Sequence, residues 1–260
     1  MKKIMFSFLA IIVASSSIAQ EDRRVNKKEE RRQRISAITR QEEEGVIKYR
    51  KHFAFGGKLT SDGYGAFVEI GRAQSINRGL LYQLEITEKK HPKEEKQQIE
   101  FTQSVPLSYG KINFLYPIKL GVQQQIVLGN KGNKNGVSVT ANVGGGLIMG
   151  ILRPYLIDVD NNGTRGYISY EDDSTAFLNS AGYIRGPSFG TGWNRSKIRP
   201  GLYVKPAIRF DYGKYNEVVN AIEVGITTEF YAKPVEQLVF QKNERLFFSG
   251  FVAIIFGRRK

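Results

Sequence analysis

Residues 137–151 read VSVTANVGGGLIMGI, a stretch whose side chains alternate in character. The odd positions are apolar, at Val137, Val139, Ala141, Val143, Leu147, Met149 and Ile151, and the even positions are mostly polar or small, at Ser138, Thr140, Asn142, Gly144, Gly146 and Gly150. Successive side chains of a strand point to opposite faces, so this is a β-strand with one apolar face. It exceeds the roughly 9 to 11 residues that a transmembrane barrel strand needs.

The first 19 residues have the layout of a secretory signal peptide. Lys2 and Lys3 precede the apolar stretch Ile4–Val13, and the small residues Ser17 and Ala19 stand just before the expected cleavage site. The apolar stretch is too short for a membrane-anchoring helix, which needs about 20 residues. We therefore expect export and cleavage before Gln20, where no cysteine is available for a lipid anchor.

The composition excludes several kinds of site. The chain has no cysteine, which excludes disulfides, thiolate metal sites and a cysteine nucleophile. Its net charge of +14 includes Lys2 and Lys3 of the expected signal peptide. For an exported protein, such a charge indicates outer-membrane lipid, lipopolysaccharide phosphates and acidic envelope proteins as partners. Nucleic acid is not expected as a partner, because no binding motif for it is present.

Residues 20–50 form a compositionally separate arm. Its basic residues are Arg23, Arg24, Lys27, Lys28, Arg31, Arg32 and Arg34, and acids such as Glu29 and Glu30 are interleaved with them. Few apolar residues are present, so the segment cannot bury much surface and is expected to be a solvated helix or mobile arm in the periplasm. The alternative is an arm that docks on an anionic surface or a partner protein.

From Lys51 onward the pattern has period two and predicts eight strands. They are His52–Leu59, Tyr64–Ala73, Leu80–Thr87, Ile112–Gln123, Val137–Leu152, Leu202–Tyr212, Ile222–Tyr231 and Phe247–Phe256. An even count is typical of bacterial outer-membrane barrels. We therefore predict an all-β fold for residues 51–260, an eight-stranded antiparallel transmembrane β-barrel.

The connections between these strands alternate in length. Short turns follow the second, fourth and sixth strands, whereas long connections of about 88–111, 157–201 and 232–246 follow the third, fifth and seventh. The tight turn at 61–63 is the exception. This asymmetry is typical of outer-membrane barrels and places both termini in the periplasm.

The alternative fold is a soluble β-sandwich, whose strands also alternate between apolar and polar side chains. Strand length argues against it, as do the aromatic residues near strand ends that would suit interfacial girdles, namely Tyr64, Tyr82, Tyr116, Tyr155, Tyr212, Phe230 and Tyr231.

The polar face of the strands is expected to point into the barrel. Its members include Lys58, Glu69, Gln83, Glu85, Lys119, Gln123, Lys205, Arg209, Asp211, Glu223 and Glu229. The interior of an eight-stranded barrel is only wide enough for side chains, and isolated buried ions are costly. We therefore predict an ion-paired network that closes the lumen and leaves no open channel.

Candidates for catalysis or metal binding are few. A base at His91 with Ser104 or Ser108 as nucleophile is conceivable, although no spacing constraint joins them. His52 is expected to lie at the periplasmic end of the first strand. The loop Asp158–Gly163 begins like a calcium loop, but Ser169 stands where a bidentate glutamate is needed. A surface turn is the favoured interpretation, so we expect no metal, no cofactor and no catalytic residue.

Several stretches together resemble a family of uncharacterised small outer-membrane β-barrel proteins of the Bacteroidota. They are 90–94 (KHPKE), 109–111 (YGK), 113–117 (NFLYP), 200–205 (PGLYVK), 221–225 (AIEVG), 233–234 (KP) and 256–258 (FGR). The resemblance extends from about Lys51 to Lys260 and omits the basic arm. It implies a closed barrel in the outer membrane and brings no established activity.

Two functions are compatible with these patterns. The first is a non-enzymatic barrel that serves as a structural or accessory subunit of an envelope complex for outer-membrane protein assembly or secretion. It is favoured by the basic arm, the long outer loops and the prediction of a lumen without an open channel. The alternative is an enzyme that modifies lipid or lipopolysaccharide at the outer leaflet, which only His91 and the nearby hydroxyl groups suggest.

Overall fold

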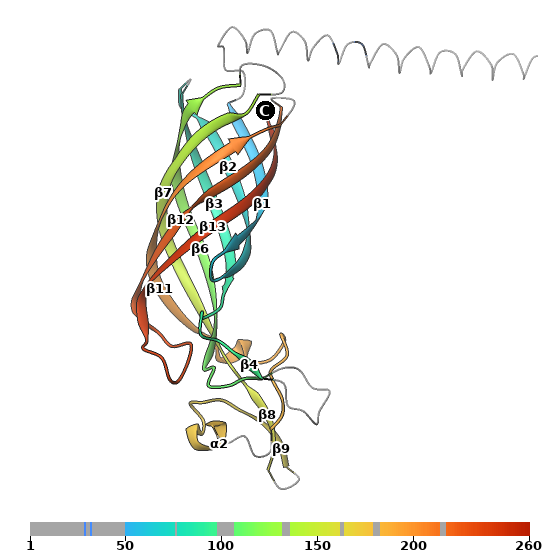
Figure 1. Cartoon of the computed structure of the whole chain (residues 1–260), viewed down its shortest axis with the longest axis vertical. Coiled ribbons are helices and arrows are strands. Elements are labelled where there is room, and N and C mark those ends of the chain that lie inside the picture. Colours follow the sequence, from blue (N-terminus) through green and yellow to red (C-terminus); the bar gives the residue numbers. More distant parts are fainter. Residues whose placement is uncertain are drawn as a thin grey trace, which may run out of the picture. The chain divides into compact units, whose positions relative to one another are not determined.

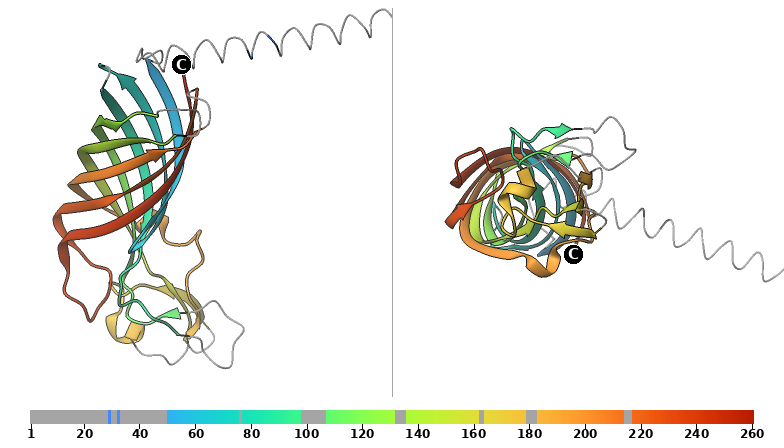
Figure 2. Two further views of the ribbon diagram at one scale, coloured as in Figure 1. Left: turned by 45° about the horizontal axis from the view of Figure 1, so that its top comes forward. Right: turned by 90° about the horizontal axis from the view of Figure 1, so that it is seen from below.

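Eight long strands close into one barrel in this computed structural model (Figure 1). They are β1 (Lys51–Thr60), β2 (Gly63–Ala73), β3 (Arg78–Lys89), β6 (Asn113–Gly129), β7 (Ser138–Pro154), β11 (Lys197–Asp211), β12 (Val218–Val235) and β13 (Glu244–Arg259). Each pairs antiparallel with its neighbours in the ring order β1-β13-β12-β11-β7-β6-β3-β2. Figure 2 (right) shows this ring from below. The predicted eight-stranded antiparallel barrel is confirmed.

The structure describes Glu29, Arg32 and residues 50–75, 77–97, 107–131, 136–161, 164–178, 183–213 and 217–260. The chain divides into one unit of Met1–Lys48 with Gly132–Lys134 and a second unit of Tyr49–Lys131 with Asn135–Lys260, which contains the barrel. Among the described residues, no helix is long and apolar enough to cross a membrane.

The alternation in β7 separates the two faces of the barrel wall. Leu147 and Val143 are 62% and 50% exposed, whereas Asn142 and Ile148 are 0% and 1% exposed. The odd residues therefore lie on the outer surface and the even residues face the lumen, because a strand alternates with period two. The apolar face is the one turned outward, as predicted.

Several strands are longer than predicted. The run of glutamines at 123–125 does not end β6, which continues to Gly129. Gln124 donates to the carbonyl of Gly79 on β3 at 3.0 Å, and Gln125 donates to Thr140 on β7 at 3.3 Å. These polar side chains remain in the strand because neighbouring strands satisfy their amides. Likewise, β11 begins at Lys197 rather than Leu202, and β12 continues to Val235.

Glycines in the wall make room for large side chains inside the barrel. A Cβ atom on Gly121 would lie 2.2 Å from the hydroxyl oxygen of Tyr203, and one on Gly71 would lie 1.8 Å from the His52 ring. The absence of a side chain at these two positions therefore lets Tyr203 and His52 lie flat over the neighbouring wall.

The two rims of the barrel differ. The turns that join β2 to β3, β6 to β7 and β11 to β12 are short, and the C-terminus lies at this short-turn rim (Figure 1). The opposite, long-loop rim carries β4 (Lys96–Gln97), β5 (Leu107–Ser108), β8 (Ile157–Asn161), β9 (Thr164–Ile168), α2 (Ser174–Leu178), β10 (Tyr183–Arg185) and the 3-10 helix η1 (Trp193–Arg195). Strands β10, β8 and β9 form a small sheet, and Leu107, Tyr155, Ile157 and Phe177 form an apolar core beside it. We call this region the loop subdomain.

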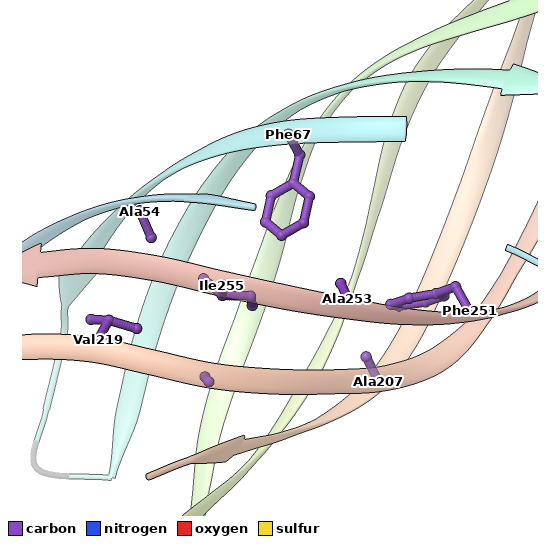
Figure 3. Close-up of a cluster of buried hydrophobic side chains, with 8 residues drawn as sticks. Ala54, Phe67, Ala207, Val219, Phe251, Ala253 and Ile255 are labelled. Atoms are coloured by element: carbon purple, nitrogen blue, oxygen red, sulfur yellow. The ribbon is translucent and has the colours of Figure 1, made fainter. Parts of the chain in front are cut away.

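The lumen also contains apolar layers. Figure 3 shows one cluster, formed by Ala54, Phe67, Ala207, Val219, Ala221, Phe251, Ala253 and Ile255. A second cluster comprises Leu115, Ile148, Leu152, Tyr203, Tyr231 and Val235. The predicted ion-paired lumen does not include these apolar layers, to which small and aromatic residues of β13 and β12 contribute.

Candidate functional site

A chain of alternating charges runs through the lumen and includes Glu229. We call it the Glu229 network, and its members are Lys58, Asp62, Glu85, Lys89, Lys119 and Glu229. Lys119 lies at its centre, with its Nζ atom 2.8 Å from Glu85 and 2.8 Å from Glu229. Lys58 contacts the other side of Glu85 at 2.9 Å. Three cations therefore meet three anions.

Lys89 extends this network to the long-loop rim. Its Nζ atom lies 3.1 Å from Glu229 and 2.8 Å from Asp62, which belongs to the β1–β2 turn. Ser249 donates its hydroxyl to the same Asp62 oxygen at 2.7 Å. Tyr231 donates to the second oxygen of Glu229 at 3.0 Å.

A second cluster lies around Glu223. This Glu223 network contains Glu69, Lys205, Arg209 and Glu223. Arg209 donates to both oxygens of Glu69 at 2.8 and 2.7 Å and to Glu223 through Nε at 2.8 Å. Lys205 lies 2.8 Å from the other oxygen of Glu223. Two cations again meet two anions, and His52 Nε2 lies 3.0 Å from Glu69.

The ring of Phe251 contacts both networks. Lys58 Nζ lies 4.0 Å from the ring centroid, and Lys205 Nζ lies 4.9 Å from it. An aromatic face attracts a cation by about 0.5 to 2 kcal/mol. Phe251 therefore contacts an ammonium group of each network.

Asp211 lies apart from both networks. It is at the short-turn rim, where Lys131 Nζ lies 3.3 Å from it and Arg259 forms a second ion pair with it. Of the nine charged lumen residues expected from the sequence, the structure brings eight into the two networks and places Asp211 in these two separate ion pairs.

The lumen charges are inaccessible to water. Lys205, Glu223 and Glu229 are each 0% exposed, and Lys119 is 1% exposed. Removing an ion from water carries a penalty of several kcal/mol, which close opposite charges and hydrogen bonds offset. A water-filled passage beside these groups would expose them. The arrangement can thus hold the wall together, but it leaves no route for solute at this level of the barrel.

Three titratable side chains that contact these networks are missing from the sequence prediction. Lys89 lies beyond the predicted end of its strand, although it shares the phase of Glu85 and Thr87. Asp62 belongs to a turn, to which alternation does not apply. His52 faces Glu69 from the short-turn end of β1.

Of the residues suggested for catalysis, His91 and Ser108 are described, and each forms a hydrogen bond with another group. His91 accepts a hydrogen bond from the backbone N–H of Lys93 at 3.2 Å, and burial lowers the pKa of His91. Ser108 is buried and donates instead to Glu94 at 3.1 Å. Ser104 lies outside the described residues. Glu94 also pairs with Lys111 at 2.7 Å, and burial lowers the pKa of Lys111.

The described residues of the calcium-like stretch, 158–161, belong to β8, which pairs with β9. Asp158 is buried in β8 opposite Tyr167, and Asn161 pairs with Thr164. The expectation of an acidic surface turn is therefore wrong for Asp158, because this residue is buried within a strand. In the described part of the chain, no group of three or more His, Asp or Glu residues could hold a metal ion.

Arg153 forms a polar anchor that the sequence does not reveal. This buried residue at the end of β7 donates to the carbonyls of Ser188, Phe189 and Thr191 at 3.1, 2.7 and 3.0 Å. Its guanidinium lies 4.2 Å from the Phe114 ring centroid and 5.2 Å from that of Trp193. It therefore ties the segment before η1 to the barrel wall.

The predicted partner-binding arm lies almost wholly outside the described residues. Of its basic residues only Arg32 is described, as an exposed helical residue. Its role remains a prediction.

Comparison with known proteins yields structural likeness only. No protein-family model and no curated protein matches the chain. Neisserial surface protein A is similar with a TM-score of 0.38 and 10% identity, over 81% of this chain and 95% of that chain. The N-terminal β-barrel domain of Pseudomonas aeruginosa OprF has a TM-score of 0.35 and 11% identity, over 80% and 98%. Ail of Yersinia pestis has a TM-score of 0.37 and 10% identity, over 82% and 100%.

Proposed function

We propose that this chain is a non-enzymatic β-barrel of a bacterial outer membrane, closed to solutes, that serves as a structural or accessory subunit of an envelope complex. The observation that carries this proposal is the inverted placement of its side chains. Apolar residues cover the outside of the barrel, and charged residues fill the inside.

The outer surface has the character of a lipid-facing belt. Phe55 and Leu59 of β1 are exposed, as are Leu202 and Val204 of β11. Contiguous apolar surface of this extent is rare on soluble monomers, since they bury such residues. Hydrocarbon around the belt would remove this surface from water, and the closed ring leaves no strand edge in the bilayer without a partner.

The filled lumen favours a structural role over transport. An eight-stranded barrel has an interior just wide enough for side chains. Here the two ion networks and the apolar clusters occupy it, so no diffusion pore is expected. The partner-binding surface would then lie outside the wall.

The loop subdomain is the element best suited to bind a partner protein. Its apolar core makes it a preformed surface, which lowers the ordering cost of binding. Tyr167 and Phe189 are exposed on it. With both termini of the barrel at the short-turn rim, that rim would be periplasmic, and the loop subdomain would be extracellular.

The signal peptide, the basic arm and the Bacteroidota resemblance agree with export to an outer membrane and remain predictions. The alternative of a lipid-modifying enzyme gains no support, because Ser108 bonds to Glu94 and His91 bonds to the backbone of Lys93.

Membrane insertion and closure can be tested on the full chain expressed in a Gram-negative host. We expect it in the outer-membrane fraction, soluble only in detergent, with an electrophoretic mobility that changes on boiling because the closed barrel resists detergent. Single-channel recordings should show no stable large conductance. A freely soluble exported chain would overturn the membrane assignment, and a stable large conductance would overturn the closed lumen.

The subunit role can be tested by photocrosslinking in cells. A photoreactive residue at Tyr167 or Phe189 should capture one or a few envelope proteins, whereas the same residue at the lipid-facing Val252 should capture none. Absence of protein adducts from both loop positions and from the arm would overturn the subunit role while leaving the barrel assignment in place.

A further inference from the structure

A row of basic side chains crosses adjacent strands where the apolar belt ends at the short-turn rim. Lys51 of β1 lies opposite Arg72 of β2. On its other side, Lys260 donates its backbone N–H to the Lys51 carbonyl at 2.8 Å. Arg258 of β13 lies opposite Phe53, one outward-facing position closer to the belt. All four basic side chains are exposed, and we call them the basic row.

The basic row is continuous with the belt. Two residues before Arg72 on the outer face is Ile70, and two residues before Arg258 is Phe256, both exposed. Lys51 is likewise two residues from the exposed Phe53. On three neighbouring strands, the outer face thus changes from apolar to cationic within one alternation step. This is the depth at which long basic side chains reach lipid phosphates.

Cations outnumber anions among the described residues of this rim. The described residues 50–51, 72–75, 77–78, 129–131, 211–213, 217–218 and 258–260 include eight Lys or Arg but only two acids, Asp211 and Glu217. Asp211 is engaged by Lys131 and Arg259. No carboxylate of the described chain forms an ion pair with Lys51 or Arg72, although like charges directly opposite each other destabilise a sheet.

We propose that the basic row binds the anionic headgroups of phospholipids in the leaflet that surrounds the short-turn rim. The inference rests on the proposed membrane-spanning barrel. It specifies the charge of the bound lipid, the leaflet in which that lipid lies and the residues that bind it. A headgroup phosphate between Lys51 and Arg72 replaces their repulsion by two charge-assisted contacts. The lipid tails then lie against Phe53, Ile70 and Phe256.

Native mass spectrometry can test this with the full chain in detergent micelles that contain equal amounts of phosphatidylglycerol and phosphatidylcholine. We expect phosphatidylglycerol adducts in roughly tenfold excess, since each cation near a lipid surface contributes a severalfold preference for anionic lipid. Combined Lys51→Gln, Arg72→Gln and Arg258→Gln replacements should bring the two lipids to near parity. Lys96→Gln, Lys233→Gln and Lys242→Gln remove the same charge from exposed positions at the long-loop rim and should leave the preference unchanged.

Two outcomes would overturn the inference: equal adducts of both lipids on the wild-type barrel, or an equal loss of preference in the two triple variants. Either result leaves the membrane assignment standing, whereas a wild-type chain that needs no detergent would overturn the proposed function itself. Should the triple variant not fold, Arg72→Gln and Arg258→Gln alone must each reduce the preference severalfold.

Discussion

Arg209 holds Glu69 through two hydrogen bonds of 2.8 and 2.7 Å, although the two residues lie 140 positions apart in the chain. One guanidinium on β11 thereby connects across the lumen to β2, and its Nε donates to Glu223 on β12. The fork of donors on arginine matches a carboxylate in a way that a lysine ammonium does not. This cross-lumen contact ties together strands that are not neighbours in the ring.

Arg209→Met should cost about 3 to 5 kcal/mol of unfolding free energy, because it leaves Glu69 buried without its strongest partner. Arg209→Lys should lie between this variant and the wild type. Denaturant unfolding of the barrel in lipid vesicles measures the difference. Arg195→Met is the control, since its pair with Asp172 is about half exposed and should contribute less than about 1 kcal/mol. Wild-type stability of Arg209→Met would contradict a dry lumen.

Phe251→Ala should destabilise the barrel by about 3 to 5 kcal/mol through loss of a buried aromatic ring. It also removes the aromatic face that Lys58 and Lys205 both contact, so the loss of cation–π attraction adds to the cost. Phe251→Leu restores most of the volume but not the aromatic face, and should recover only part of the stability. Equal stability of the leucine variant and the wild type would show that the cation–π contacts contribute nothing.

Much of the lumen could be predicted from alternation alone. Lys58, Glu85 and Lys119 occupy positions whose neighbours two residues away also face inward, and a charge on the lipid side would be costly. For Lys89 the same phase continues, but the polar run 89–91 ends the predicted strand at Thr87. The length of a strand beyond its apolar belt depends on pairing with its neighbours, here with β6, which a single strand's pattern does not show.

Which lumen residues pair with each other could not be predicted, because the pairing depends on how the ring of strands closes.

The prediction of aromatic girdles at the strand ends shows the same limit. Tyr64, Tyr82, Tyr212 and Phe230 are exposed as expected, whereas Tyr116, Tyr155 and Tyr231 are buried. Tyr231 points inward to Glu229, and Tyr155 accepts a hydrogen bond from the backbone of Ser108. An aromatic residue near a strand end suits either location, and only the surrounding loops decide between them.

Asp62 should make stability depend on pH. Burial alone would raise its pKa, but the Lys89 ammonium and the Ser249 hydroxyl hold the pKa below its ordinary value of 3.8. The folded state thus binds this proton more weakly than the unfolded chain does. The stabilisation is therefore present above pH 3.8 and is lost as the pH falls through the lower folded-state pKa.

The difference in unfolding free energy between the wild type and Asp62→Asn should consequently shrink as the pH is lowered below 3.8. Denaturant unfolding at a series of pH values measures it. The same comparison in a Lys89→Gln background is the control, because the cation that lowers the pKa is gone, and there the difference should be small throughout. A constant difference in the wild-type background would contradict the Asp62–Lys89 pair.

Arg153 should hold the segment before η1 in place, whereas its replacement should leave the folding of the barrel unchanged. Its Nη1 atom donates to three backbone carbonyls in residues 188–191, and its planar guanidinium also lies over the rings of Phe114 and Trp193, a contact that the smaller, more strongly hydrated ammonium group of lysine does not reproduce. Arg153→Lys should therefore accelerate chymotrypsin cleavage near Phe189 and Trp193 severalfold, while the boiling-dependent mobility of the barrel stays unchanged. Arg195→Lys, at an exposed position in the same region, should leave the cleavage rate at the wild-type level. If both variants are cleaved at the same rate, the carbonyl contacts of Arg153 do not hold this segment in place.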